Sequence, residues 1–316
     1  MSRRRMMMGG GIASAEEDIF ANYLTVRALV DDFDLFFSGG DLEYCIHSEG
    51  VWKPLPNQIL TPSISQGDAI SFRANLIPTT SGIGVFTVNG MFALEGNCMS
   101  ILYGDDAAYY TSVPSYAFYR LFGGCWYLTS VAPSFLPATT LSESCYRNMF
   151  VDCQSLETAP VLPSTVMASN CYRGMFSGCF SLVNAPVLPA TTLATYCYAW
   201  MFENCSSLVD APALPATTLA TYCYNYMFYG CTKLSMAPAL PALSLKERCY
   251  NFMFYGCSKL SYVKAMFTSY PGTTYTGQWL YGVSDNGTFV KNSLALWNVY
   301  GSSGIPATWT VETANN

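Results

Sequence analysis

Apolar residues recur at a fixed spacing in the second half of the chain, in a block repeated every 26 residues. The block reads Cys-Tyr-x-x-Met-Phe-x-x-Cys-x-x-Leu and begins at Cys145, Cys171, Cys197, Cys223 and Cys249. Within each block the apolar positions fall at i, i+1, i+4, i+5 and i+8, which predicts a two-turn helix with one buried stripe. A fixed period of this length predicts a solenoid, whose units bury their apolar faces only against their neighbours.

A short apolar segment bounded by prolines follows each block, for example at residues 211–215. We interpret this segment as a minimal strand or extended rung that stacks in parallel on its copies. Because proline cannot donate to a ladder, the hydrogen-bonded strand should be only about two or three residues long. Thr217 or Thr218 then turns the chain and can accept hydrogen bonds from free amides at the next helix start.

The repeat motif resembles a known family. The stretch Met-Phe-x-x-Cys-x-Ser-Leu at residues 175–182, followed by Leu-Pro at 188–189, resembles the bacterial surface leucine-rich repeats of the BspA-like (Treponema-type) family. The resemblance covers about residues 121 to 262, including one degenerate copy at 121–137. It implies a leucine-rich-repeat surface protein of Bacteroides-type bacteria or their phages. The alanine-proline rung departs from the Leu or Ile that is usual in leucine-rich repeats.

The first half of the chain instead alternates apolar and polar residues over short runs. The runs at 24–29, 42–46, 69–74 and 84–88 predict strands, and turn clusters such as 38–40 separate them. Several short strands at this spacing predict a small β-sandwich. After the last repeat, residues 279–291 carry a hairpin signal and 305–311 predict a further strand.

Together these patterns predict an α+β fold in which an N-terminal β-sandwich is followed by a short leucine-rich-repeat solenoid and a C-terminal β cap. The expected parts are a flexible or docking tail at 1–15, the sandwich at 16–110, the solenoid at 111–264 and the cap at 265–316. The tail carries Arg3, Arg4 and Arg5 before a weak apolar stretch. It can be a cleaved secretion signal, a flexible basic tail or a segment that docks into a larger assembly. No apolar run is long enough for a transmembrane helix.

The chain has thirteen cysteines, which invite a disulfide or metal interpretation. The two cysteines of one block would lie about 12 Å apart on a helix, too far for a disulfide. There is no Cys-x-x-Cys pair, and His47 is the only histidine. We therefore predict a ladder of reduced thiols and no metal, with bridging between neighbouring rungs and metal binding as the alternatives. The ladder residues are Cys145, Cys153, Cys171, Cys179, Cys197, Cys205, Cys223, Cys231, Cys249 and Cys257.

Charge and motifs argue against several functions. A net charge of −6 and a charged fraction of 11% argue against nucleic-acid binding. Tyr103-Gly104-Asp105-Asp106 matches the metal-binding turn of viral polymerases, but no basic cluster for phosphates surrounds it. Any Ser-His or Cys-His nucleophile would have to use His47. We therefore expect no enzymatic activity and no cofactor.

Aromatic residues recur at equivalent positions of successive repeats, off or at the edge of the buried stripe. Such rows can stack on sugar rings or anchor a protein partner. The alternative is that each row packs on itself and shields the edges of the rungs. The candidate binding residues are Tyr196, Trp200, Tyr222, Tyr226, Tyr229, Phe252 and Tyr255.

These observations predict a non-enzymatic recognition or structural protein displayed on a phage particle, as part of a tail or fibre. It would bind a host surface glycan or protein through the solenoid, and other virion or surface proteins through its N-terminal region. A secreted bacterial cell-surface adhesin is the first alternative, and a glycan-active enzyme with accessory repeats is the second. Whether copies of the chain form a homo-oligomer stays open.

Overall fold

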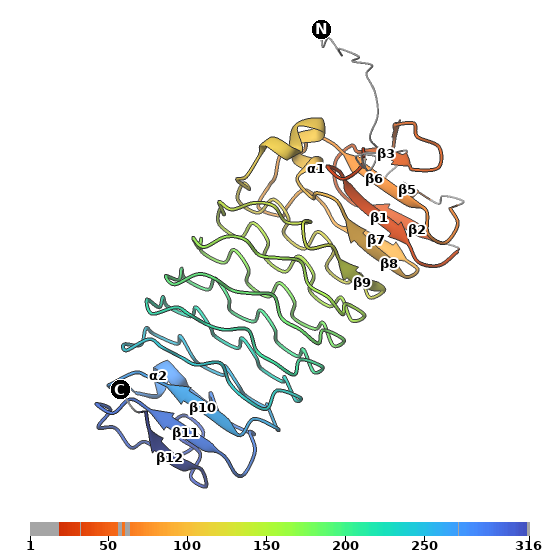
Figure 1. The fold of residues 1–316 in the computed structure, drawn as a ribbon. Helices are drawn as coiled ribbons and strands as arrows, with labels where there is room; N and C mark the ends of the chain where they lie inside the picture. The colour runs from red at the N-terminus through yellow and green to blue at the C-terminus, as the bar shows by residue number, and fades with distance from the viewer. Residues whose placement is uncertain (1–18, 32, 56–58, 61–63, 271, 315–316) are drawn as a thin grey trace, which may run out of the picture.

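The computed structural model describes residues 19–31, 33–55, 59–60, 64–270 and 272–314. Figure 1 shows an elongated molecule in which N-terminal sheets, a stack of coils and a small C-terminal sheet follow one another in chain order. We call one 26-residue repeat a coil and residues 111–264 the repeat region. The predicted tail at 1–15 lies outside the described residues, and the predicted domain boundaries stay predictions.

Two sheets form the N-terminal part. The larger has the strand order β4-β3-β6-β1-β8-β9, and the smaller has the order β5-β2-β7. The larger sheet comprises β1 (Leu24–Ala28), β3 (Glu43–Ile46), β4 (Lys53–Pro54), β6 (Ala69–Arg73), β8 (Phe92–Glu95) and β9 (Leu128–Val131). The smaller comprises β2 (Asp34–Phe37), β5 (Ile59–Leu60) and β7 (Phe86–Asn89).

The two sheets contact each other through aromatic side chains. The ring of Phe86 lies 5.3 Å from Phe72 of the larger sheet and 4.6 Å from Phe37 of its own. This arrangement is compatible with the predicted β-sandwich, and the four predicted strands correspond to β1, β3, β6 and β7. Phe86 also stacks on Phe122 at 5.2 Å, and β8 pairs in parallel with β9. The N-terminal sheets therefore share one core with the first coil.

The predicted α+β fold class is wrong, because the repeat region contains no helix. Helix within the described residues is confined to α1 (Ser100–Tyr103), the 3-10 helix η2 (Gly104–Tyr109) and α2 (Thr273–Thr276). The stretches predicted as helices are runs of turns, and the prolines and alanines of the predicted rungs form no strand. Beside these segments, strand-type pairing between neighbouring coils is limited to isolated parallel bridges, such as Asn184 with Asp210. The repeat region is therefore not the predicted leucine-rich-repeat solenoid of short helices and minimal stacked strands.

Left-handed backbone conformations explain the absence of helices. In the first complete coil, Ser144, Asn148 and Asp152 have φ values of 55°, 55° and 59°. One such residue every four interrupts any helix, because a right-handed helix needs φ near −60° throughout. Gly178, with φ of 76°, occupies the position equivalent to Asp152, and a Cβ atom there would lie 2.3 Å from Asp152 Oδ1. Glycine fits this place without strain, and a side chain there would have to displace the Asp152 carboxylate.

Backbone hydrogen bonds within a coil alternate with bonds to the next coil. Met149 N–H donates to the Tyr146 carbonyl in its own coil at 3.2 Å, whereas Phe150 N–H donates to the Met175 carbonyl of the next coil at 3.0 Å. The same alternation holds in all five blocks. Amides of the buried stripe are thus satisfied without either a helix or a strand ladder.

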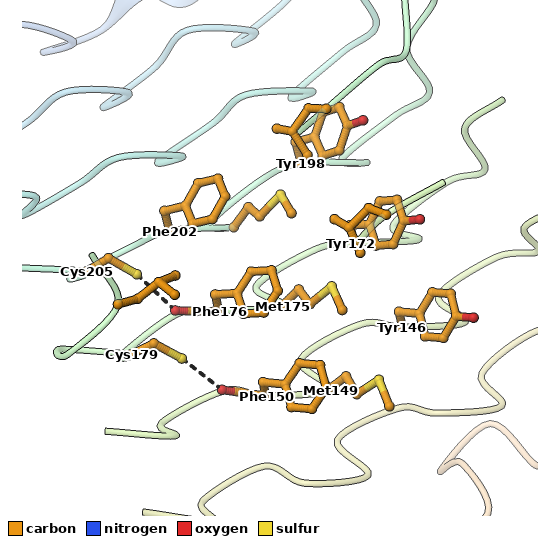
Figure 2. Packing of buried hydrophobic residues seen from close by; sticks show 14 of the residues in the cluster. Tyr146, Met149, Phe150, Tyr172, Met175, Phe176, Cys179, Tyr198, Phe202 and Cys205 are labelled. Carbon is orange, nitrogen blue, oxygen red and sulfur yellow. Dashed lines mark hydrogen bonds between the residues drawn. The ribbon is translucent and has the colours of Figure 1, made fainter. Parts of the chain in front are cut away.

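The apolar stripe itself is buried as predicted. Its Cys, Tyr, Met and Phe side chains are 0–2% exposed in every block. Figure 2 shows that equivalent rings form columns, with Phe150, Phe176 and Phe202 in one and Tyr146, Tyr172 and Tyr198 in another. Ring centres within these two columns lie 5.8–6.0 Å apart, with nearly parallel planes. Each coil therefore packs against both neighbours.

Replacing Phe202 by Ala is expected to lower the free energy of unfolding by about 3–5 kcal/mol. The ring is fully buried between Phe176 and Phe228, so truncation leaves a cavity that also loosens the adjacent coils. The urea midpoint measures the loss. Phe180→Ala is the control, because Phe180 is 43% exposed and should cost less than about 0.5 kcal/mol. Equal midpoints for the two variants would mean that the columns do not stabilise the stack.

The C-terminal sheet is parallel. Strand β10 (Tyr262–Ala265) pairs with β11 (Thr288–Lys291), which pairs with β12 (Thr310–Thr313), both in parallel. The hairpin predicted at 279–291 is therefore wrong. Residues 279–282 instead continue the stack. The Trp279 carbonyl accepts a hydrogen bond from the Phe254 amide, and the Trp279 side chain is fully buried. The chain thus keeps its coil-like register after the Cys-Tyr-Met-Phe motif has ended.

Candidate functional site

The ladder cysteines lie inside the stack and are all free thiols. The second cysteine of each block donates to the carbonyl of the phenylalanine one coil earlier. Cys179 Sγ lies 3.2 Å from the Phe150 oxygen, and Cys205 Sγ lies 3.1 Å from the Phe176 oxygen (Figure 2). The same bond recurs at Cys153, Cys231 and Cys257. These thiols therefore hold adjacent coils together.

Burial raises the pKa of every thiol in the ladder, and that of Cys171 reaches about 12. Because the thiolate is the reactive form, the native protein should react with at most about one equivalent of a thiol reagent at pH 8. Thirteen equivalents should react in denaturant, and a reducing agent should leave the melting temperature unchanged. Rapid modification of the native protein, or destabilisation on reduction, would contradict this role.

The predicted binding residues come together at one face of the repeat region. Trp200, Tyr226 and Phe252 form a stacked column with ring centres 5.4 and 4.5 Å apart. Tyr196 and Tyr222 stack beside it at 4.3 Å, and the rings of Tyr196 and Trp200 lie 6.1 Å apart. All five side chains are half-buried. Their ring faces are covered by one another, so they present mainly ring edges to solvent.

A third column flanks the first on its other side. Tyr229, Tyr255 and Tyr281 stack at 4.8 and 4.9 Å, and Tyr226 lies 5.5 Å from Tyr229. Tyr281, the last ring of this column, is 51% exposed. We call these eight residues the aromatic face. This stacking agrees with the alternative that each row packs on itself. The three columns also adjoin one another, so they form one continuous aromatic surface.

Arginine side chains cover the ends of the columns. The guanidinium carbon of Arg173 lies 4.6 Å from the ring centre of Trp200 and 5.1 Å from that of Tyr196. At the other end of the two-ring column, Arg248 lies 5.3 Å from Tyr222. Such contacts are typical cation–π interactions, which fix the plane of the guanidinium.

A hollow of about 270 Å³ adjoins the N-terminal end of the aromatic face. It exists because Gly174 and Ser177 stand where later coils carry aromatic rings: Gly174 is equivalent to Trp200 and Ser177 to Tyr229. The hollow is lined by Arg147, Asn148, Val151, Arg173, Gly174, Ser177, Trp200 and Glu203.

The charged groups of the hollow are unequally partnered. Glu203 accepts a hydrogen bond from Ser177 Oγ at 2.9 Å, and burial raises the pKa of its carboxyl. Arg173 donates to Asn170 Oδ1 at 3.3 Å, and burial together with the nearby charge of Arg147 lowers its pKa. Arg147 Nε is buried without a hydrogen-bond partner. Within the described part of the chain, neither guanidinium forms an ion pair.

Sequence reasoning missed Tyr281 and the arginines. Tyr281 follows Tyr255 by one period, a signal obscured because Trp279 and Leu280 replace Met and Phe. Arg147 and Arg173 are also one period apart, but their position falls beside the aromatic rows only when every fourth residue is left-handed. A helix would have pointed them elsewhere.

The other motifs considered for catalysis are engaged in structural contacts. Asp105 accepts from Arg73 at 2.8 Å and from the Tyr23 hydroxyl at 2.9 Å. His47 Nε2 lies 2.8 Å from Ser71 Oγ, which is also bonded to Thr25. Ser71 is fully buried in the larger sheet, so its hydroxyl is not accessible to a substrate.

Comparison with protein-family models, curated proteins and solved structures found no match to this chain. The described residues contain no cluster of three or more His, Cys, Asp or Glu side chains suited to hold a metal ion. None of their helices has the length and apolar character needed to cross a membrane.

Proposed function

We propose that this chain is a non-enzymatic recognition protein of a phage particle, which binds a host surface glycan or protein through the aromatic face. The observation that supports the proposal is the continuity of that face: eight tyrosine, tryptophan and phenylalanine rings in three adjoining columns. Tyr, Trp and Arg dominate the residues that contribute most to binding at protein interfaces.

Rigidity favours binding at this face. Each ring is stacked on its neighbours in the next coils, and the coils are joined by backbone and thiol hydrogen bonds. Side chains that are already ordered lose little conformational entropy when a partner binds. A folded stack with low charge and a face of half-buried rings is suited to attachment. The resemblance of its motif to bacterial surface repeats supports the same role.

Two measurements test the proposal. Fluorescently labelled protein is applied to a glycan array and to intact cells of a panel of Bacteroides-type strains, and saturable binding to either is expected. Binding to neither would contradict it. The N-terminus of the native protein then separates display on a particle from secretion: retention of Met1 or Ser2 supports a virion, whereas a start near Glu16 supports a secreted bacterial adhesin.

A further inference from the structure

The hollow beside Trp200 holds two positive charges without a negative partner. Arg147 and Arg173 are half-buried and occupy equivalent positions of adjacent coils. Bringing two like charges together at a partly dehydrated site costs free energy unless an anion compensates it. The acidic side chain that lines the hollow, Glu203, is bonded to Ser177 and forms no ion pair with either arginine. The arrangement is therefore short of one anion.

The guanidinium of Arg173 is oriented before any ligand arrives. It lies over both Trp200 and Tyr196, in the place that an aromatic ring takes in the later coils. Stacking on ring faces leaves the N–H edges of a guanidinium available, and those edges match the two oxygens of a carboxylate. Arg147 is held similarly, 5.5 Å from the ring centre of Tyr119.

The remaining lining residues restrict what kind of anion can bind. Glu203 would repel negative charge placed beside it, so the ligand must carry its charge at the arginine end only. At the other end, Glu203 can accept hydrogen bonds from hydroxyl groups, and Asn148 and Ser177 can both donate and accept. An acidic sugar has this division between one carboxylate and several hydroxyls. The hollow, at about 270 Å³, approaches the usual size of a small-molecule site.

We propose that this hollow binds the acidic sugar of a host surface glycan, with its carboxylate paired to Arg147 and Arg173 and its hydroxyls bonded to Glu203. The inference rests on the proposed function and names its ligand class. The aromatic face beyond Trp200 would then contact the rest of the glycan or the surface that bears it.

Titration calorimetry of the full chain tests the inference with the methyl glycosides of glucuronic, galacturonic and N-acetylneuraminic acid. Methyl glucoside and methyl galactoside, which lack the carboxylate, are the uncharged controls for the first two. At least one of the three acidic glycosides should bind. If the glucuronide or the galacturonide binds, its affinity should be at least about tenfold higher than that of its uncharged control. Arg173→Gln should weaken binding of the acidic glycoside about tenfold or more. Arg248→Gln is the matched control, because it removes the guanidinium stacked at the other end of the two-ring column, which does not line the hollow, and should leave the affinity unchanged.

Ser177→Tyr provides a second variant that keeps both arginines. It places in the hollow the ring that Tyr229 supplies two coils later, and should abolish binding of the acidic glycoside. Thermal melts verify that each variant is folded. Unchanged affinity in folded Arg173→Gln or Ser177→Tyr would overturn the inference. If wild-type protein attaches to cells but none of the three acidic glycosides binds, the inference fails and the proposed function stands; if it neither attaches nor binds, both fail.

Discussion

The protein is expected to lose most of its stability between about pH 8.5 and pH 10, because its buried thiols ionise only after unfolding. Burial raises the pKa of each of the ten ladder cysteines, to about 12 for Cys171 and Cys249. An unfolded cysteine has a pKa of about 8.5. Above that value the unfolded chain releases protons that the folded chain retains, so the free energy of unfolding falls as the pH rises.

The size of this effect follows from the number of thiols. Each one lowers the free energy of unfolding by about 1.4 kcal/mol per pH unit between its unfolded and folded pKa values. Ten together give on the order of 10 kcal/mol per pH unit, which is comparable with the entire stability of a typical domain. The full stability is present below about pH 8.5 and is lost on the way to pH 12.

Urea midpoints measured by circular dichroism at pH 7, 8, 9 and 10 check this expectation. The double variant Cys179→Ala, Cys205→Ala is the comparison, and it should be less stable at pH 7. Its free energy of unfolding should fall less steeply with pH, because unfolding of the variant releases about two protons fewer than unfolding of the wild type. If the wild-type midpoint is the same at pH 7 and pH 10, the thiols are not buried in the folded protein.

Much of the core could be predicted from the sequence, whereas the backbone conformation could not. Met201 and Phe202 are buried because transfer of their side chains from water is favourable in any compact structure. The 26-residue period likewise brings equivalent residues together whatever path one coil follows. Apolar pairs recurring every four residues, however, match a short helix and a chain of four-residue turns equally well. Over the eight residues of one block, the helical period of about 3.6 residues and the turn period of about four residues differ too little to distinguish a helix from a chain of turns.

A local signal for the turns was present but incomplete. Asp152, Gly178 and Asn204, which occupy the third left-handed position, are residue types that tolerate positive φ, and glycine is unfavourable in a helix. At the second position the chain instead has Trp200 and Tyr226, which rarely adopt that conformation. The left-handed conformation of these two residues is explained only by their hydrogen bonds and ring stacking with adjacent coils. Such long-range contacts cannot be predicted from the sequence of one repeat. For the same reason, the aromatic rows of the site could be predicted but the arginines and the hollow could not.

Replacing Trp200, Tyr226 and Phe252 together by Asn is expected to weaken attachment to host cells by at least about a hundredfold. The three rings form the central column of the aromatic face, and both flanking columns contact it. Asparagine is chosen because the chain itself carries Asn148 at the equivalent left-handed position, so the substitution avoids adding backbone strain. Some loss of stability is expected, since three half-buried rings are removed.

The matched control is the double variant Asp105→Asn, Asp106→Asn. It removes two charges from η2 and one exposed ion pair with Arg73, which contributes at most about 1 kcal/mol. Attachment should be unaffected. An aspartate pair that proved essential for turnover of some substrate would instead support an enzyme.

The central claim, that the aromatic face is the binding surface, is tested most directly by one titration. Wild-type protein and the Trp200, Tyr226, Phe252→Asn variant, each verified as folded by circular dichroism, are titrated onto cells of a strain that the wild type binds. We predict saturable binding for the wild type and an apparent affinity at least about a hundredfold weaker for the variant. A folded variant that attaches with wild-type affinity would contradict the claim.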